Sequence, residues 1–236
     1  MSGCFYAIGG ANYEKNESLI IDLDIIKSTG KTYPVCLYIG AANPDINKCF
    51  KFKEYYEKLG FVVDILPFDL SGIDVEEAFN KADIIYLGGG ITARLKEYYL
   101  KFNLLNPTIN AYKNGKIIVG VSAGAILLFE CGYGDKEAYT YNLETVNHNL
   151  TSGLGIFKGI FCPHYQNSGL LSFHDEVKKH QCDAFALENG AALKINEDGY
   201  YVVKDKGANA FKFDSFDNHK LVYLKKDIFY RENLFK

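Results

Sequence analysis

Several features that would assign the chain to a particular class of protein are missing from its 236 residues. No basic segment followed by an apolar one begins the sequence, and no uninterrupted apolar run approaches the roughly 20 residues that a membrane-spanning helix needs. Lysine and arginine number 26 against 29 aspartates and glutamates, so the net charge of −3 gives no reason to expect nucleic acid or an anionic membrane as a partner. We therefore expect a cytoplasmic protein that binds neither.

The sequence also lacks the residue spacings that are typical of metal-binding and dinucleotide-binding sites. Its six cysteines include no C-x-x-C pair, and several lie within apolar runs such as "PVCLYIG" (34–40), so buried free thiols are expected rather than a disulfide or a zinc site. The glycine-bearing stretch "IGGANYE" (8–14) does not complete a G-x-G-x-x-G motif, and its "IGGAN" corner is interpreted as an ordinary turn. We predict neither a cofactor nor a metal.

What the sequence does contain is an alternation of short β-rich runs and longer helical patterns over its first two thirds. Strands are expected at 4–10, 34–40, 61–68, 83–90 and 116–122, and helices at 18–28, 47–60, 75–82, 92–102 and 125–132. This alternation predicts an α/β fold, with a mostly parallel sheet and helices on both faces. No Pro- or Ser-rich linker divides the chain, so residues 1–236 are expected to form a single hydrolytic domain.

The pattern changes after residue 183. Residues 184–213 form short β-rich runs separated by "NG" (189–190), "DG" (198–199) and "KG" (206–207). Such dipeptides are typical of tight turns between paired strands. We therefore expect antiparallel hairpin strands in the C-terminal part.

One serine lies at a glycine-flanked corner where an expected strand meets an expected helix. Residues 120–124 read "GVSAG", the G-x-S-x-G pattern of a nucleophile elbow. A sharp bend strains the backbone at the serine and lifts the hydroxyl of Ser122 clear of the sheet, and the tight turn requires small neighbours. A plain turn remains the alternative interpretation.

An oxyanion-binding site is expected beside this serine. The N–H of Ala123 begins the following helix and points back towards the bend. The preceding loop, "LGGGIT" (87–92), carries Gly89 and Gly90, where the lack of a side chain lets a backbone N–H approach a reacting carbonyl. A bare turn is the alternative for this loop.

A serine hydroxyl needs a base to take its proton. Of the five histidines, His164 follows an apolar run in "GIFCPHYQ", so we expect it at the C-terminal end of a strand, on the same sheet edge as Ser122. An acid should orient the imidazole. We favour Asp135, in the loop expected after the helix, and keep Glu137 as the alternative acid. For both, a solvated surface carboxylate is the competing interpretation.

Four segments in this order and spacing resemble a known family: "IIYLGGG", "GVSAGAILLFE", "GIFCPHY" and "ALENGAAL". The chain resembles the serine peptidase family that contains peptidase E, an aspartyl dipeptidase, and cyanophycinase. The resemblance implies a fold like that of class I glutamine amidotransferases, with Ser122 as nucleophile, His164 as base and an acid in the loop that holds Asp135. It implies hydrolysis of a small peptide next to aspartate through an acyl-enzyme, without a metal.

One departure puts the Asp-X specificity in doubt. The family often carries arginines after the histidine, whereas "HYQNSGLLSFHDEVKKH" contains none. Lys178, Lys179, His174 and His180 are the cationic or near-cationic groups in that stretch, Arg94 is a further candidate anchor, and a lysine lacks the two-pronged fit of arginine to a carboxylate. The substrate is therefore left open, as is the choice between monomer and homodimer.

Two other functions compete with the peptidase. An esterase of the α/β-hydrolase type also runs serine, acid, histidine along the chain, but its histidine lies nearer the C-terminus, where His219 would serve. A non-catalytic module that senses a small metabolite is the second alternative. The presence of both Ser122 and His164 argues against it.

Overall fold

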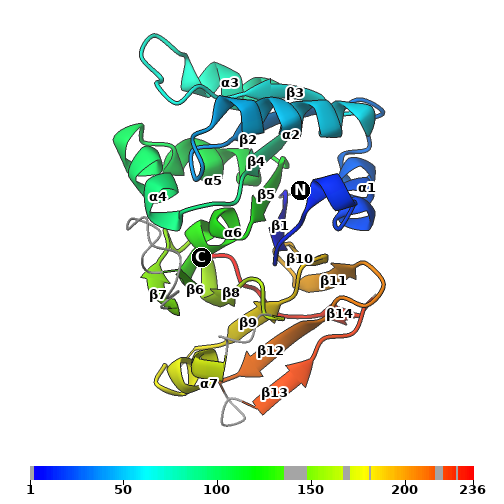
Figure 1. Cartoon of the computed structure of the whole chain (residues 1–236), viewed down its shortest axis with the longest axis vertical. Coiled ribbons are helices and arrows are strands. Elements are labelled where there is room, and N and C mark those ends of the chain that lie inside the picture. The colour runs from blue at the N-terminus through cyan, green and yellow to red at the C-terminus, as the bar shows by residue number, and fades with distance from the viewer. Residues whose placement is uncertain (1–2, 136–147, 167–170, 181, 216–219, 227) are drawn as a thin grey trace.

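The computed structural model describes the chain except for residues 1–2, 136–147, 167–170, 181, 216–219 and 227 (Figure 1). Within the described residues the strands form two sheets. The first sheet contains β1 (Cys4–Ile8), β2 (Val35–Ile39), β3 (Val62–Ile65), β4 (Ile84–Leu87), β5 (Ile117–Val121), β10 (Ala191–Ile195), β11 (Tyr200–Lys204) and β14 (Phe229–Tyr230). The second contains β6 (Phe129–Asp135), β7 (His148–Ser152), β8 (Phe157–Cys162), β9 (Ala184–Leu187), β12 (Ala210–Asp214) and β13 (Lys220–Tyr223).

Most helices follow strands of the first sheet along the chain, whereas α7 follows β8 of the second sheet. They are α1 (Leu19–Thr29), α2 (Ile46–Lys58), α3 (Val75–Lys81), α4 (Thr92–Lys101), α5 (Leu105–Lys113), α6 (Ala123–Leu128) and α7 (Leu171–Lys178), with a short 3-10 helix at Tyr13–Lys15. Two helix starts are capped by aspartate: the carboxylates of Asp45 and Asp74 accept hydrogen bonds from the N–H groups of Asn47 and Glu77.

The first sheet has the order β14-β11-β10-β1-β5-β4-β2-β3. Strands β1, β5, β4, β2 and β3 run parallel, and β10, β11 and β14 extend the sheet in antiparallel fashion from the β1 edge. Because β1 and β5 are adjacent, the corners that follow Ile8 and Val121 lie side by side at the C-terminal edge of the sheet. The predicted mostly parallel sheet with antiparallel C-terminal strands is confirmed.

Helices cover both faces of the first sheet, as predicted (Figure 1). On one face, apolar residues of α1 and α2, such as Ile21 and Phe52, pack on Tyr6 and Val119 of the sheet. The other face is covered by α3 to α6. Strands β1, β4 and β5 are therefore buried on both sides, which explains their nearly continuous apolar sequences, whereas the edge strand β3 exposes Val62 and Asp64.

The second sheet has the order β13-β12-β9-β8-β6-β7 and occupies the lower part of Figure 1. Its contact with the first sheet is aromatic: the rings of Phe5 in β1 and Phe157 in β8 stack with centroids 4.4 Å apart, and Phe129 of β6 lies 6.0 Å from Phe5. All three side chains are buried. One apolar core therefore includes residues of both sheets.

Three local expectations are corrected by the structure. The helix expected at 125–132 is α6, which ends at Leu128, and the chain continues as strand β6. Helix α5 was not expected; Pro107 lies in its first turn, where a proline is tolerated. Of the three expected hairpin turns, "DG" joins the paired strands β10 and β11, whereas "NG" and "KG" connect strands of different sheets.

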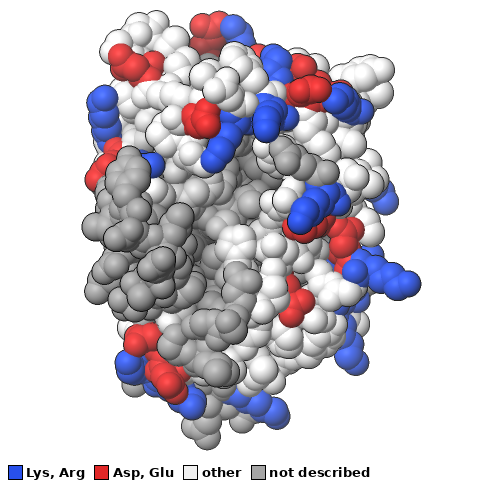
Figure 2. Space-filling view, viewed as in Figure 1, with Lys and Arg blue, Asp and Glu red and all other residues white. Residues whose placement is uncertain are grey.

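The six cysteines are free thiols. Cys36, Cys49 and Cys162 are buried, as expected, whereas Cys4, Cys131 and Cys182 are only partly buried. No described helix combines the length and the apolar character needed to cross a membrane. On the face shown in Figure 2, acidic and basic side chains are interspersed, and neither sign forms an extended patch over the described surface.

Candidate active site

Ser122 lies at the corner between β5 and α6 with φ 50° and ψ −109°, a conformation that non-glycine residues rarely adopt. Its N–H donates to the carbonyl of Ile8 at 3.0 Å, which ties the corner to β1. The flanking glycines are required by space: a side chain at Gly120 would come within 2.6 Å of the backbone of Gly124, and one at Gly124 would overlap the carbonyl of Leu87. The strained, glycine-flanked corner predicted from the sequence is therefore present.

His164 brings its imidazole to this corner. Its Nε2 lies 2.9 Å from Ser122 Oγ, and its backbone, at φ 54°, donates an N–H to the carbonyl of Gly9 at 2.9 Å. The residue follows β8, so it stands beyond the C-terminal end of a strand, as expected. That strand belongs to the second sheet, however, which corrects the expectation of a shared sheet edge with Ser122.

Asn189 contacts the second ring nitrogen of the His164 imidazole. Its Oδ1 lies 2.7 Å from His164 Nδ1. An amide oxygen only accepts, so this contact places a proton on Nδ1 and leaves Nε2 free to accept the hydroxyl proton of Ser122. The N–H of Asn189 in turn donates to Gln166 Oε1 at 3.0 Å. The side chains of Ser122, His164 and Asn189 thus form one continuous hydrogen-bonded line.

Gly10 lies directly against this line. A side chain at Gly10 would overlap Asn189 Oδ1 and come within 2.5 Å of His164 Nδ1. Its carbonyl accepts the N–H of Gly190 at 2.9 Å, which anchors the turn that carries Asn189. Sequence reasoning missed both residues, because "IGGAN" was interpreted as an ordinary turn and "NG" as a hairpin. The available signal was the glycine pair at the C-terminal end of a central strand.

The side chains of the predicted acids lie outside the described structure, and Asp135 belongs to a strand, which corrects the expectation of a loop. Asp135 is the last residue of β6, where its backbone pairs with that of His148, but its side chain lies outside what the structure describes. Glu137 lies wholly outside the described residues, as does His219, the base of the esterase alternative. The roles given to these three residues stay predictions.

Two of the expected oxyanion donors, Gly89 and Gly90, line the same cavity as Ser122, and the third, Ala123, follows it in the chain. A Cβ on Gly89 would lie 3.6 Å from Ser122 Cβ, so its backbone borders the nucleophile. Gly90 has φ 144° and packs so closely on the carbonyl of Ala42 that a side chain would not fit. Within the described part of the chain, the N–H groups of Gly89, Gly90 and Ala123 donate to no backbone acceptor. Their role as oxyanion donors stays a prediction.

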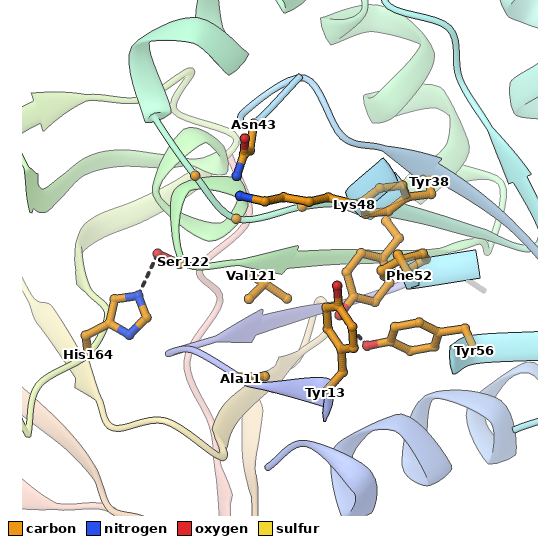
Figure 3. Close-up of a pocket in the computed structure, with 14 residues that line it drawn as sticks. Ala11, Tyr13, Tyr38, Asn43, Lys48, Phe52, Tyr56, Val121, Ser122 and His164 are labelled. Atoms are coloured by element: carbon orange, nitrogen blue, oxygen red, sulfur yellow. Dashed lines mark hydrogen bonds between the residues drawn. The ribbon is translucent and has the colours of Figure 1, made fainter. Parts of the chain in front are cut away.

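A cavity of about 300 Å³ opens beside Ser122 and His164, and we call it the Ser122 cavity (Figure 3). It is lined by Ala11, Tyr13, Tyr38, Asn43, Lys48, Phe52, Tyr56, Tyr86, Gly88, Gly89, Gly90, Val121, Ser122 and His164. Figure 3 shows the aromatic rings gathered at the end away from His164, with Val121 between. The sequence did not single out Lys48 or these rings, because α2 reads as an ordinary amphipathic helix.

A buried polar network supports the aromatic end of this cavity. The hydroxyls of Tyr56 and Tyr86 are 2.7 Å apart, and Tyr56 donates to Asp22 Oδ1 at 3.0 Å. Ser18 donates to Asp22 Oδ2 at 2.8 Å. Burial raises the pKa of the Asp22 carboxyl to about 7 and the pKa values of both tyrosines far above their ordinary value. The phenol groups are therefore neutral.

The cationic groups considered as substrate anchors lie elsewhere. Lys178 and Lys179 form exposed ion pairs with Asp175 and Glu176 on α7, and neither they nor Arg94 lines the Ser122 cavity. His174 Nε2 contacts the hydroxyl of Tyr165 at 2.5 Å, and burial lowers its pKa. Among the described residues, no three His, Cys, Asp or Glu side chains gather into a group that could hold a metal ion.

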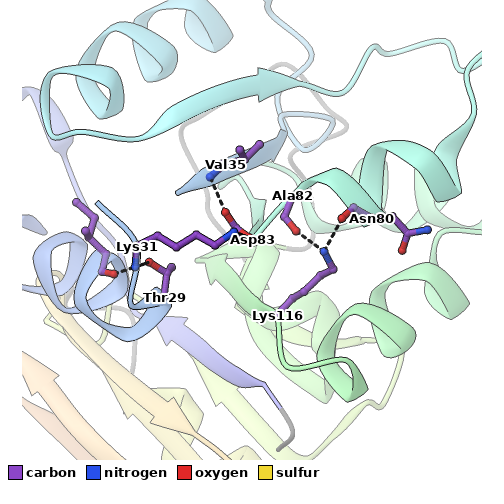
Figure 4. Close-up of polar contacts among 8 residues, drawn as sticks. Thr29, Lys31, Val35, Asn80, Ala82, Asp83 and Lys116 are labelled. Carbon is purple, nitrogen blue, oxygen red and sulfur yellow. Dashed lines mark hydrogen bonds and ion pairs between the residues drawn. The ribbon is translucent and has the colours of Figure 1, made fainter. Parts of the chain in front are cut away.

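The opposite edge of the first sheet is closed by polar contacts of a structural kind (Figure 4). Asp83 accepts a hydrogen bond from the N–H of Val35 at 3.0 Å and pairs with Lys31 at 2.7 Å. Lys116 donates to the carbonyls of Asn80, at 2.8 Å, and Ala82. These contacts hold the N-terminal ends of β2, β4 and β5 together. The strained backbone at Ser122 and the Ser122 cavity lie at the opposite, C-terminal edge of the sheet.

Comparison with known proteins places this geometry in a family. Residues 5–203 match the family model described as Peptidase family S51. The chain is 29% identical over 214 residues to the uncharacterized peptidase YgaJ of Bacillus subtilis, a match that covers 87% of this chain and 90% of the relative. It is 31% identical over 119 residues to Peptidase E of Salmonella arizonae, where the match covers 49% of this chain and 50% of the relative.

Two solved structures share the fold. A peptidase from an acI-B1 Actinobacterium has a TM-score of 0.74 with 18% identity, over 98% of each chain. A putative peptidase E protein from Listeria monocytogenes EGD-e has a TM-score of 0.63 with 18% identity, over 87% of this chain and all of the other. The resemblance seen in the sequence motifs is confirmed: the chain belongs to peptidase family S51, and the enzyme is a peptidase.

Proposed function

We propose that the enzyme is a serine peptidase that hydrolyses small peptides, dipeptides above all, through an acyl-enzyme formed on Ser122. The observation that carries the proposal is the 2.9 Å contact between Ser122 Oγ and His164 Nε2 at a strained, glycine-flanked corner. Nucleophile, base and orienting group within hydrogen-bond reach of one another are the signature of an activated serine.

In the first half of the reaction, Ser122 Oγ attacks the carbonyl carbon of the scissile amide while its proton passes to His164 Nε2. The negative charge on the carbonyl oxygen is stabilised by the N–H of Ala123 and by that of Gly89 or Gly90. The protonated imidazole then donates from Nε2 to the leaving nitrogen. The C–N bond breaks, the amine departs, and an ester remains on Ser122.

In the second half, His164 Nε2 takes a proton from water, and the resulting oxygen nucleophile attacks the ester carbonyl. The same N–H groups stabilise the second oxyanion. Collapse of this intermediate returns the proton to Ser122 Oγ and releases the acid. Throughout both halves, Asn189 Oδ1 accepts the Nδ1 proton of His164 and keeps the ring in its reactive orientation, without adding a charge.

The size of the cavity supports a small substrate. A volume of about 300 Å³ lies at the lower end of the range for ligand sites, which suits about one amino-acid residue beside the reacting carbonyl. This restriction favours dipeptides over protein chains.

A fluorophosphonate probe combined with a dipeptide library tests the proposal. The probe should label the wild type and not Ser122→Ala, and the wild type should release free amino acids while Ser122→Ala does not. Ser71→Ala, which alters an exposed serine, serves as the control and should match the wild type. A wild type that neither reacts with the probe nor cleaves any dipeptide would instead support the metabolite-sensing alternative.

A further inference from the structure

The Ser122 cavity has a rigid aromatic wall. The ring of Tyr38, at the end of β2, stacks on Phe52 of α2 with centroids 3.7 Å apart, and Phe52 meets Tyr86 of β4 edge-to-face at 4.8 Å. A side chain at Gly88 would come within 2.5 Å of the Tyr38 hydroxyl, so the backbone of the glycine loop also confines this ring. Such a wall is preformed to receive a flat apolar side chain, because little ordering remains to be done on binding.

The charge of the cavity has one sign. Lys48 lies exposed on its rim, and Figure 3 shows its ammonium group near Asn43. Within the described residues, Lys48 has no ion-pair partner, and no Asp or Glu lines the cavity. The Asp22 carboxyl lies behind Tyr56 and is fully buried. A carboxylate is therefore favoured at this rim, and an ammonium group is disfavoured.

These two features select one end of a dipeptide. The N-terminal residue of a dipeptide carries an ammonium group, and the C-terminal residue carries a carboxylate. A cavity of about 300 Å³ has space for one of the two residues. The residue that satisfies both the aromatic wall and the cationic rim is a C-terminal residue with an aromatic side chain.

We propose that the enzyme prefers dipeptides whose C-terminal residue is aromatic, with the ring against Tyr38 and Phe52 and the free carboxylate at Lys48. This inference rests on the proposed serine peptidase function and adds the substrate class. It assigns Lys48 as a binding residue for the leaving amino acid.

The test measures kcat/KM for dipeptides with Phe, Tyr, Leu, Ala or Lys at the C-terminus, each with Ala or Asp at the N-terminus. The Phe and Tyr substrates should exceed the Ala substrates by roughly tenfold or more. Amidation of the C-terminal carboxylate should lower kcat/KM by about fivefold, as expected for an ion pair at an exposed rim. No C-terminal aromatic preference, or equal rates for acid and amide, would overturn the proposal.

The variant Lys48→Met assigns the charge effect to one residue. It should remove the difference between the free acid and the amide while it keeps the preference for an aromatic ring. Lys51→Met changes an exposed lysine on the same helix outside the cavity and should retain the difference. A preference for Asp at the N-terminus that is insensitive to C-terminal amidation would place the N-terminal residue in the cavity instead and reject the assignment of Lys48.

Binding separates this inference from the proposed function. Titration calorimetry with Ser122→Ala, which does not need turnover, should show tighter binding of Ala-Phe than of Ala-Ala and of Ala-Phe amide. If no dipeptide is cleaved by the wild type but this order of binding holds, the hydrolytic proposal fails and the ligand class stands. If dipeptides are cleaved and the order is absent, the ligand class fails alone.

Discussion

The two sheets contribute different parts of the active site. The first sheet supplies the Ser122 corner and the glycine loop with Gly89 and Gly90, and together with helix α2 it forms the wall of the cavity. The second supplies the strand that leads to His164. Asn189 lies on the connection that passes from β9 in the second sheet to β10 in the first. The nucleophile and its base are therefore brought together by the packing of one sheet against the other.

The sheets also differ in how charge is buried. In the region of the first sheet, Asp22 is fully buried with hydroxyl partners, and burial raises its pKa to about 7. In the second sheet, Lys212 lies 2.7 Å from both Asp183 and Glu232 and is 12% exposed. Burial alone would raise the pKa of Asp183, but hydrogen bonds from Lys212 and Ser215 outweigh it and lower that pKa. One region thus tolerates a neutral acid, while the other depends on an ionised one.

The largest expected effect on kcat comes from removing the side chain of Ser122 or of His164, which meet where the two sheets pack together. Ser122→Ala and His164→Ala should each lower kcat by about 10⁴-fold or more, and the double variant should lose little beyond either single one, because the two groups act as a unit. His180→Ala is the control and should keep wild-type kcat. Losses that multiply in the double variant would show that the residues act independently.

A smaller loss of kcat is expected when a side chain is added at Gly10, which lies against His164 and Asn189. Gly10→Ala puts a methyl group into the space of His164 and Asn189, so the imidazole must shift and kcat should fall by about 100-fold. Gly207→Ala meets open space and should keep its kcat even if it unfolds at a lower temperature. Rates are to be compared below both melting temperatures. A Gly10→Ala enzyme within twofold of the wild type would contradict the packing argument.

Substitution of Asn189 can change the contact with His164 Nδ1 without removing the nucleophile or the base. In Asn189→Asp, a carboxylate faces Nδ1 and stabilises the protonated imidazole, so the acidic limb of the kcat/KM profile should move to higher pH by roughly 1 unit. Asn189→Ala should lower kcat by roughly 10- to 100-fold, because the ring loses its orienting partner. The measurement is a full pH–rate profile for each variant. Superimposable acidic limbs for the wild type and Asn189→Asp would exclude a positioning role.

The ion pairs of the second sheet should matter for stability. Lys212→Met leaves Asp183 and Glu232 without their cation, and the free energy of unfolding at pH 7 should fall by about 3 kcal/mol. Lys179→Met removes an exposed pair with Glu176 and should leave the free energy of unfolding close to that of the wild type, because exposed ion pairs contribute little. Urea denaturation measures both. Equal losses of unfolding free energy in the two variants would show that the buried Lys212 pairs stabilise the protein no more than an exposed pair does.

The last effect is a loss of stability with rising pH, and it is expected at Asp22. Because its folded-state pKa is raised from 3.8 to about 7, the folded protein keeps this proton between those pH values while the unfolded chain loses it. Wild-type stability should therefore fall as pH rises from 5 to 8, by roughly 2 to 3 kcal/mol relative to Asp22→Asn. Urea denaturation of both proteins at pH 5 and pH 8 measures the difference. A gap that does not change with pH would contradict the assignment.

Prediction from the sequence succeeded where a feature is built from neighbouring residues. The Ser122 corner requires only a strand, two glycines and a helix start, all within 116–128. The parallel strands are predicted by their apolar runs. It failed where two plausible local structures compete. Residues 129–132 continue a helix-forming pattern but are a strand, because β8 offers them a parallel partner. The cavity wall was missed because Phe52 and Tyr56 look like ordinary core residues of an amphipathic helix.

By itself, the sequence determined the α/β class, the strained serine, the glycine loop beside it and the choice of His164 among five histidines. Only the tertiary structure decided that the strand before His164 belongs to a second sheet, that Asn189 faces its imidazole, and that Lys48 stands at the rim of an aromatic cavity. The physical reason is the range of the interactions. A bend follows from the φ and ψ preferences of adjacent residues, whereas the Ser122–His164–Asn189 line joins three segments that meet only when the two sheets bury their shared aromatic core.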